Sequence, residues 1–502
     1  MGNIVEHTAN STRATPLFLS LLFVLLLSVQ LLLYRDSFAV KPSSDDFISL
    51  YQINRGEKQG VSSFFMASND GTYRPLQNLT FWLFGRFFER HILLSLRILH
   101  FLSSTFYTLV AFLWIRALNF NRVGAIAAAG IVFFHPTLAG VLAGLDNYSR
   151  LVVNAWVWLG AWVAYRCGRQ PLLAVPLVSL CFAIGLGYME YAITLIPLAI
   201  LATAWRVETR RLYYASAMFV SLMAIFSVYF LIRVSGMVAT TPGTGYLSLS
   251  PLVWVKNTAM MLAAVLFFGN TVPIMLEGSL PRLAWLGWNV TLVALAFAYG
   301  LWAGHHGFPI VANQPSPLRF LGAAFAVTFF PILLMTHVSE IYLPAIILAL
   351  ALLTGLAAHG WTTVSRPLRY VALFLAGSQL FLASNAIRGK VAGINEAGER
   401  TDAMMQQLLK HIPNDGETKR VAIVFLKRNA AHSKGYSIFA VPDDQLVQHG
   451  YAWFAIRWFR PDQDVALDHL VVADPSDIDL KSYDLVFLWE GSTKQFNPIG
   501  ER

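Results

Sequence analysis

Long apolar stretches recur along this chain and limit what it can fold into. The first, residues 16–33, contains no charged residue, and roughly 20 apolar residues in a helix cross a bilayer core of about 30 Å. The 502 residues are 56% hydrophobic and only 13% charged, whereas about a quarter of an average soluble protein is charged. The sequence therefore predicts an all-α polytopic membrane protein with about eleven transmembrane helices. The other ten apolar stretches lie near 92–115, 123–140, 151–165, 171–189, 191–205, 213–232, 283–303, 317–336, 340–358 and 367–385.

Charge asymmetry orients these predicted helices. The segment 252–269 is ambiguous, because Lys256 interrupts it and Pro273 follows soon after. If that segment does not cross, the N-terminal segment and five arginine-bearing loops all fall on one side of the membrane, as the positive-inside rule expects of the cytoplasmic side. We therefore expect a cytoplasmic N-terminus, an extracytoplasmic C-terminus and a plasma or inner membrane location. The arginines on the cytoplasmic side are then Arg13, Arg116, Arg122, Arg166, Arg169, Arg206, Arg210, Arg211, Arg319, Arg366 and Arg369.

The composition of the chain changes near residue 387. Residues 1–386 form the predicted transmembrane domain, whose long outer loop, 35–91, carries the main candidate site. After that point charge rises and apolar runs shorten, which indicates a small soluble α/β or α+β domain, residues 387–502, outside the membrane. Its candidate elements are a helix over 399–411, ending before Pro413, and strands over 421–426 and 485–488.

Two adjacent carboxylates, Asp45 and Asp46, follow the first span in the outer loop. Adjacent residues point in different directions, so one acid can face a substrate while the other holds a backbone amide, a metal or an arginine. A simpler interpretation is that residues 43–46 cap a short helix beginning at Phe47, because Ser and Asp are preferred N-cap residues. The two interpretations are compatible, since a helix N-terminus also holds an acid in place.

Other polar residues are expected at the outer ends of the spans. Arg150 begins a predicted span, where it either pairs with a lipid phosphate or anchors the helix by snorkelling. Glu190 is nearly intramembrane, and such acids usually face a cavity or form a buried ion pair. His135 lies at another outer boundary, but no closely spaced cluster of ligands predicts a metal site. The two cysteines, Cys167 and Cys181, imply no disulfide framework.

The order of these features resembles that of the C-type (GT-C) polytopic glycosyltransferases, in particular the protein O-mannosyltransferases and the transmembrane, tetratricopeptide-containing O-mannosyltransferases. The resemblance covers roughly residues 17–360 and rests on five short motifs. Met189 stands where a lysine is common in the family, and the C-terminal domain lacks tetratricopeptide repeats. The motifs are Asp45-Asp46-Phe47, residues 73–81 (similar to "YRPL..LTF"), Phe134-His135-Pro136 with Arg150 downstream, residues 188–195 (similar to "KE.AITLP") and Tyr342-Leu343-Pro344 (similar to "YLP").

The resemblance implies a sugar donor carried on polyprenyl phosphate, an acceptor hydroxyl on a protein, lipid or glycan at the outer face, and inversion at the anomeric carbon. In that scheme Asp45 is the base, Asp46 helps to orient the reacting groups, and Arg150 and Arg74 hold the phosphate. No cofactor is required, although a divalent cation is compatible with the scheme. Membrane lipids are expected partners and nucleic acid is not. The residues expected to orient these groups or the acceptor are Tyr73, His135, Glu190, Glu340 and Tyr342.

Three other functions remain compatible with these features. A transporter or flippase of polyprenyl-linked glycans would use Glu190 for ion coupling, and inverted internal repeats would favour it. A polymerase or ligase of polyprenyl-linked glycans would depend on outer arginines and histidines rather than on the acidic pair. A non-catalytic assembly subunit would bind partners through the C-terminal domain.

Overall fold

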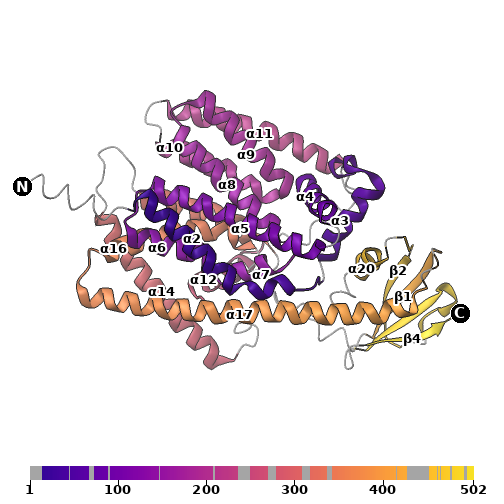
Figure 1. Cartoon of the computed structure of the whole chain (residues 1–502). Helices are drawn as coiled ribbons and strands as arrows, with labels where there is room; N and C mark the ends of the chain where they lie inside the picture. The colour runs from indigo at the N-terminus through magenta and orange to yellow at the C-terminus, as the bar shows by residue number, and fades with distance from the viewer. Residues whose placement is uncertain are drawn as a thin grey trace, which may run out of the picture.

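The computed structural model of the chain combines a body of packed helices with one small sheet (Figure 1). Two residues of the predicted site, Asp45 and Glu340, lie outside the described residues. The structure describes residues 14–43, 46–66, 73–88, 91–145, 147–206, 210–235, 249–269, 279–307, 317–335, 342–413, 415, 417–426, 451–460, 462–463, 465–474, 477–490 and 495–501.

Each of the eleven apolar stretches predicted from the sequence contains a helix. Among the described residues, seven helices are long and apolar enough to cross a membrane, namely α2, α5, α9, α11, α14, α16 and α17. The total of eleven spans stays a prediction. The ambiguous segment forms a helix of 16 residues, α12 (Pro251–Leu266). The other bounds are α2 (Pro16–Leu33), α5 (Ile92–Ala117), α6 (Arg122–Phe134), α8 (Tyr148–Cys167), α9 (Pro171–Tyr188), α10 (Leu195–Arg206), α11 (Arg211–Ser235), α14 (Leu280–Gly307), α15 (Pro317–Leu333), α16 (Pro344–Trp361) and α17 (Arg366–His411).

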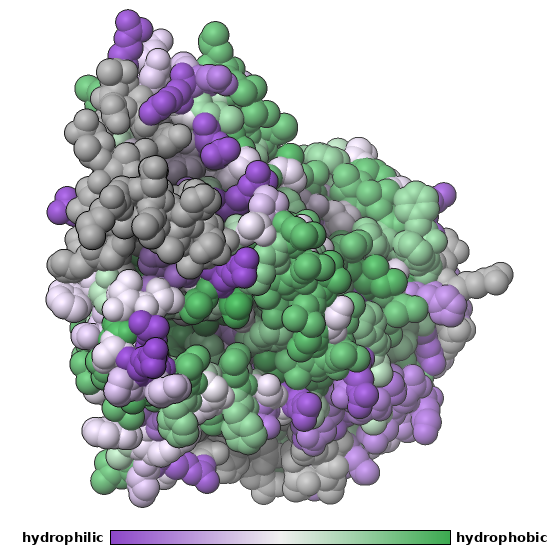
Figure 2. Space-filling model, turned by 60° about the vertical axis from the view of Figure 1, so that its left-hand side comes forward, coloured by the Kyte–Doolittle hydropathy of each residue, from purple (hydrophilic) through white to green (hydrophobic). Residues whose placement is uncertain are grey.

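The surface of the helical body agrees with a membrane setting. Figure 2 shows a broad hydrophobic area across the middle of one face, with hydrophilic residues gathered at its margins. Large apolar side chains are exposed on α2 and α17, among them Leu21 and Phe374. Water would oppose so much contiguous apolar surface on a soluble protein, whereas lipid does not. The fold class predicted from the sequence, a helical integral membrane protein with a small C-terminal α/β domain, is confirmed.

The interior of the helical body is organised around α16, whose side chains are almost all buried. This helix packs against α6, α14 and α15. Glycines allow the closest of these approaches: a Cβ atom at Gly124 of α6 would lie 2.6 Å from the Gly355 carbonyl oxygen of α16. On the other side, α8 packs against α5, α9 and α10. These contacts hold the start of α5, the start of α8 and the end of α9 together, and the predicted site residues lie near these helix ends.

A mixed four-stranded sheet forms the C-terminal domain. Its strand order is β2-β1-β3-β4, with β1 parallel to β2 and β3, and β3 antiparallel to β4. The helix α20 (Tyr451–Phe459) packs against it. Both expected strands are present, as β1 and β3. The strands are β1 (Lys419–Leu426), β2 (Val465–Val472), β3 (Leu485–Glu490) and β4 (Gln495–Glu501).

One long helix, α17, links this sheet to the helical body. It has 46 residues, which at 1.5 Å per residue is roughly 70 Å, more than twice the thickness of a bilayer core. Figure 1 shows it running along the whole helical body and on to the sheet. The predicted helix over 399–411 is its last part, and the predicted domain boundary near residue 387 falls inside it. The C-terminal domain is therefore attached to the membrane part by a continuous helix.

Two short helices lie at the same end of the body as the sheet (Figure 1). They are α3 (Asp46–Gln59) and α4 (Pro75–Phe87), accompanied by the 3₁₀ turns η1 (Arg35–Ala39) and η2 (Val61–Phe65). Helix α20 packs on α3 through aromatic contacts, with Tyr51 against Trp453 and Phe47 against Phe459. The helix that begins beside the acidic pair thus shares its hydrophobic core with the C-terminal domain.

Candidate functional site

Asp46 is fixed by backbone amides. It is the first residue of α3 and is 3% exposed. Its carboxylate accepts hydrogen bonds from the Ser43 amide at 2.9 Å and from the Leu145 amide at 2.8 Å. Both amides lie outside α3, so the Asp46 carboxylate ties the start of this helix to Ser43 and to a loop 99 residues further along. The interpretation of residues 43–46 as a helix cap stays a prediction.

Two polar residues of α5 bind the segments on either side of Asp46 in space, near Val40 and near Leu145. Arg97 is fully buried and donates to the carbonyl oxygens of Val40, at 2.9 Å, and Ala143. The ring nitrogens of His100 lie 3.1 Å from the Val141 oxygen and 2.9 Å from the Leu145 oxygen. The short helix α7 (Leu138–Ala143) and the loop after it are thus held to α5 by side-chain hydrogen bonds. Sequence reasoning missed both residues, because they interrupt an otherwise apolar span.

A second acid, Glu190, lies between two arginines. Its Oε2 is 3.2 Å from Nη2 of Arg74, and its Oε1 is 3.0 Å from Nη1 of Arg233. About 27–30% of each of the three side chains is exposed. The three come from three elements: the residue before α4, the 3₁₀ turn η4 (Glu190–Thr194) and the last turn of α11. The predicted residues Arg74 and Glu190 are therefore brought together, and the structure adds Arg233 to them.

Tyr73 belongs to the same cluster. Its carbonyl oxygen accepts a hydrogen bond from the Tyr229 hydroxyl at 3.0 Å, and the two rings pack with their centroids 5.5 Å apart. Tyr229 lies one helical turn before Arg233 on α11. The end of α11 is therefore attached to the start of α4, which sets the distance between the two arginines. In the sequence, Arg233 is an arginine directly after a predicted span. Arginines that only anchor a helix in the membrane occur at the same position, so this signal is not specific.

Arg150 and Tyr342 form a separate contact. The Arg150 guanidinium lies 4.8 Å from the centroid of the Tyr342 ring, and its Nε donates to the Asn147 side chain at 2.8 Å. Two residues predicted for the site are therefore neighbours although they are far apart in the sequence. An arginine held over an aromatic ring keeps its fork of donors in a defined plane.

The start of α8 connects these groups. The Tyr148 hydroxyl donates to the Gln77 carbonyl oxygen on α4 at 2.9 Å, and its ring packs against Tyr188, just before Glu190. Tyr188 shares a hydrogen bond of 3.1 Å with Thr80 of α4. Close packing of α4 on α9 depends on Gly187, where a Cβ atom would lie 2.6 Å from the Leu76 side chain. Arg74, Arg150 and Glu190 are thus carried by elements that contact one another.

Several buried polar atoms near the start of α8 have no hydrogen-bond partner among the described residues. They are Gln77 Oε1, Ser149 Oγ and Asn154 Oδ1. Buried polar atoms are almost always paired in folded proteins, so an unpaired group needs an explanation.

His135 is placed apart from the arginine cluster. It is fully buried at the end of α6, where its ring nitrogens lie 2.7 Å from the Thr137 hydroxyl and 3.0 Å from the Val265 oxygen. The Lys390 side chain of α17 donates to the neighbouring Pro136 oxygen at 3.3 Å. These contacts join α6, α12 and α17. Among the described residues, no three His, Cys, Asp or Glu side chains are grouped closely enough to hold a metal ion.

No family model matches the sequence, and no curated protein matches it either. Solved structures are similar to it at low identity. The arabinofuranosyltransferase AftD from Mycobacteria superposes with a TM-score of 0.45 and 16% identity over 80% of this chain, which corresponds to 29% of AftD. ArnT from Cupriavidus metallidurans superposes over 93% of both chains with 12% identity, at TM-scores of 0.49 in its apo state and 0.47 bound to undecaprenyl phosphate.

Proposed function

We propose that this protein is a GT-C-type membrane glycosyltransferase that moves a sugar from a polyprenyl-phosphate donor to an acceptor hydroxyl at the outer face. The observation that carries the proposal is the placement of Glu190 between Arg74 and Arg233. Two guanidinium groups and one carboxylate leave one positive charge in excess. Arginine forks match phosphate oxygens, and such charge-assisted bonds are the strong ones.

The arrangement of this cluster suits a leaving group whose charge changes. A phosphate that carries a sugar has one negative charge, and the released lipid phosphate has a second ionisable oxygen. Preorganised positive charge stabilises the charge that develops as the bond to the anomeric carbon breaks. Glu190 keeps the two arginines apart and balances part of their charge while no donor is bound. Arg150, held over the ring of Tyr342, supplies a further guanidinium on a neighbouring element.

Asp45 is the base in this proposal. The acceptor oxygen forms a bond to the anomeric carbon from the face opposite the phosphate, the bond between that carbon and the phosphate oxygen breaks, and the acceptor proton goes to the Asp45 carboxylate. The configuration at the anomeric carbon inverts. The anchoring of its neighbour Asp46 by two backbone amides supports this role, because a base must be held in position to take the proton in the transition state.

The sugar and the membrane orientation are the finer parts of the proposal. The motifs that resemble those of the O-mannosyltransferases make a mannose donor the first one to test. The arginine-rich loops support a cytoplasmic N-terminus, which leaves the reaction on the opposite side.

The decisive experiment incubates the purified full-length protein with a panel of polyprenyl-phosphate sugars and with peptide, lipid and glycan acceptors. Mass spectrometry then measures which donor is converted to free polyprenyl phosphate. We expect one donor to be consumed only when an acceptor is present. Transport of an unchanged polyprenyl-linked glycan across proteoliposomes, without conversion, would contradict the proposal and favour a flippase.

A pair of variants tests the phosphate site itself. Arg233→Ala should weaken donor binding about 10- to 100-fold, because a hydrogen bond between charged groups contributes roughly 1.5–3 kcal/mol. The matched control is Arg169→Ala, an exposed arginine in the turn between α8 and α9, which should bind the donor normally. Equal donor affinity in Arg233→Ala and Arg169→Ala would mean that the donor phosphate does not bind at this cluster.

A further inference from the structure

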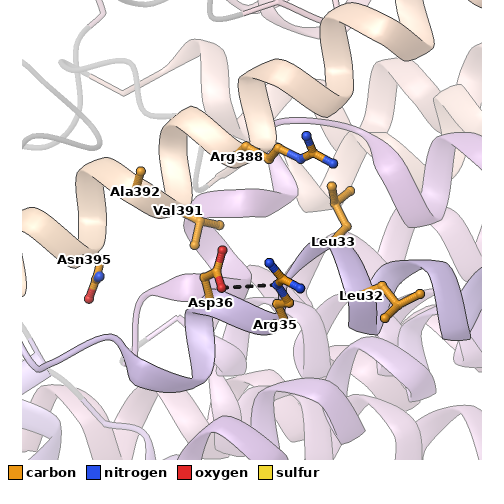
Figure 3. Close-up of a pocket in the computed structure, with 8 residues that line it drawn as sticks. All are labelled: Leu32, Leu33, Arg35, Asp36, Arg388, Val391, Ala392 and Asn395. Carbon is orange, nitrogen blue, oxygen red and sulfur yellow. Dashed lines mark ion pairs between the residues drawn. The ribbon is translucent and has the colours of Figure 1, made fainter.

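A groove lies between the end of α2 and the long helix α17, outside the site described above. It has a volume of about 660 Å³ and is lined on one side by Leu32, Leu33, Arg35 and Asp36, and on the other mainly by residues around Arg388 of α17. Figure 3 shows Arg35 and Arg388 extending toward the same space from η1 and α17. The groove therefore combines apolar and cationic walls.

The level of this groove relative to the membrane follows from the two helices that form it. The apolar part of α2 ends at Leu33, and Arg35 follows at once. The predicted apolar stretch 367–385 of α17 ends just before Arg388. Both arginines thus come directly after apolar helical segments, which is the level of lipid headgroups. Leu32 is 70% exposed and Phe381, on α17, is 67% exposed, so lipid chains have apolar surface on both helices.

The charges of the groove suit one phosphodiester. Arg35 pairs with Asp36 at 3.4 Å, and both side chains are about three-quarters exposed. An ion pair so open to water is weak, so Arg35 can turn toward a ligand at little cost. Arg388 has no ion pair or hydrogen bond with any residue that the structure describes. Two arginines and one aspartate leave one positive charge, which matches the single negative charge of an anionic phospholipid headgroup.

We propose that this groove binds an anionic glycerophospholipid of the membrane. Arg35 and Arg388 bind its phosphodiester oxygens, and its acyl chains lie along the exposed apolar faces of α2 and α17. Because the two arginines belong to different helices, a bound phosphate links the end of the first span to α17. This site is separate from Arg74 and Arg233, where the sugar donor is proposed to bind, and it does not depend on that proposal.

The test uses the delipidated full-length protein in detergent, with phosphatidylglycerol added back and bound lipid counted by native mass spectrometry. We expect one phosphatidylglycerol to bind more tightly than phosphatidylcholine, and Arg388→Ala to weaken that binding about 10-fold. The double variant with Arg35→Ala should lose it. Arg388→Lys should recover part of the affinity, because it keeps the charge but not the fork of donors.

The control is Arg369→Ala, which removes an exposed arginine at the other end of the same helix. We expect it to keep the tightly bound phosphatidylglycerol. If Arg369→Ala loses as much phosphatidylglycerol binding as Arg388→Ala, or if phosphatidylcholine binds equally tightly, the lipid contacts the protein surface non-specifically. Either result would overturn the proposal. Displacement of phosphatidylglycerol by polyprenyl phosphate at lower concentration would assign the groove to the polyprenyl lipid, and displacement by inorganic phosphate to a soluble anion. Thermal unfolding of each variant checks that it is folded.

Discussion

The two acids that the structure describes at the candidate site, Asp46 and Glu190, are held in contrasting ways. Asp46 is almost completely buried and accepts hydrogen bonds from two backbone amides. Glu190 is about a quarter exposed and contacts two arginine side chains. Backbone amides cannot turn away without unfolding the loops that carry them, whereas guanidinium groups can turn toward a ligand. Asp46 thus supports the scaffold, and the Glu190 cluster is suited to exchange partners with an anion.

The largest expected effect lies next to the fixed acid. Asp45→Asn keeps the shape of the side chain but cannot take up the acceptor proton, so sugar transfer should fall roughly 100-fold or more while donor binding remains. Transfer is measured with saturating donor and acceptor. Glu57→Gln, on the exposed face of α3, is the matched control. Near-normal turnover in Asp45→Asn would mean that Asp45 is not the base and only caps a helix, because Asn caps as well as Asp.

Asp46→Asn should act on stability instead of on chemistry. An amide offers one oxygen, and its NH₂ group would face a second backbone N–H, so one buried donor loses its partner. Such a loss costs on the order of 1–3 kcal/mol. Thermal unfolding followed by tryptophan fluorescence measures the change, with Glu57→Gln again as the control. An unchanged midpoint of unfolding, combined with a strong loss of transfer, would instead give Asp46 a direct part in the reaction.

Glu190→Gln should increase the affinity for polyprenyl phosphate, whereas an arginine variant should decrease it. Removing the carboxylate leaves Arg74 and Arg233 with no negative charge between them, so polyprenyl phosphate should bind roughly 3- to 10-fold more tightly, less than for a fully buried pair because the cluster is partly exposed. Product release and turnover should slow. Competition between polyprenyl phosphate and the donor measures this change. Weaker binding of polyprenyl phosphate in Glu190→Gln would show that the acid orients the arginines and does not compete for them.

The smallest effect concerns Lys41, which joins the segment before the acidic pair to α17. Its Nζ lies 3.0 Å from both Glu399 and Asp402, and hydrogen bonds to Asp402 and Glu399 raise the pKa of Lys41 above its usual 10.5. A group whose pKa is raised by folding stabilises the fold below its unfolded pKa and loses that contribution as the pH rises through the raised value.

Lys41→Met should therefore lower the midpoint of thermal unfolding slightly near pH 7. The difference from the unmodified protein should shrink as the pH rises above 10.5. The control is Lys410→Met, which removes an exposed lysine of α17. It should change neither the midpoint of unfolding near pH 7 nor its dependence on pH. A difference between Lys41→Met and the unmodified protein that is independent of pH would mean that Lys41 acts by packing and not by charge.

Much of the fold followed from local patterns in the sequence. Apolar stretches of sufficient length became helices, because backbone groups in a membrane must bond within their own segment. The change in composition near residue 387 indicated the C-terminal α/β domain, and two of its strands were predicted. Glu190 was singled out because an acid is costly beside a bilayer, and Tyr73 and Arg74 because they lie in a short motif that resembles one of the GT-C family. These properties depend on residues close together in the chain, so the sequence by itself determined them.

Tertiary structure alone decided how these residues are used. The Leu145 amide that binds Asp46 is 99 residues away, and Arg74 meets Glu190 across 116 residues. Arg233 has the same sequence context as an anchoring arginine, and only the packing of α11 beside η4 and the start of α4 gives it a carboxylate partner. The contact of α20 with α3 likewise has no local signal. Such pairings depend on which helix ends meet in space, which is set by packing of the whole helical body and not by any single segment.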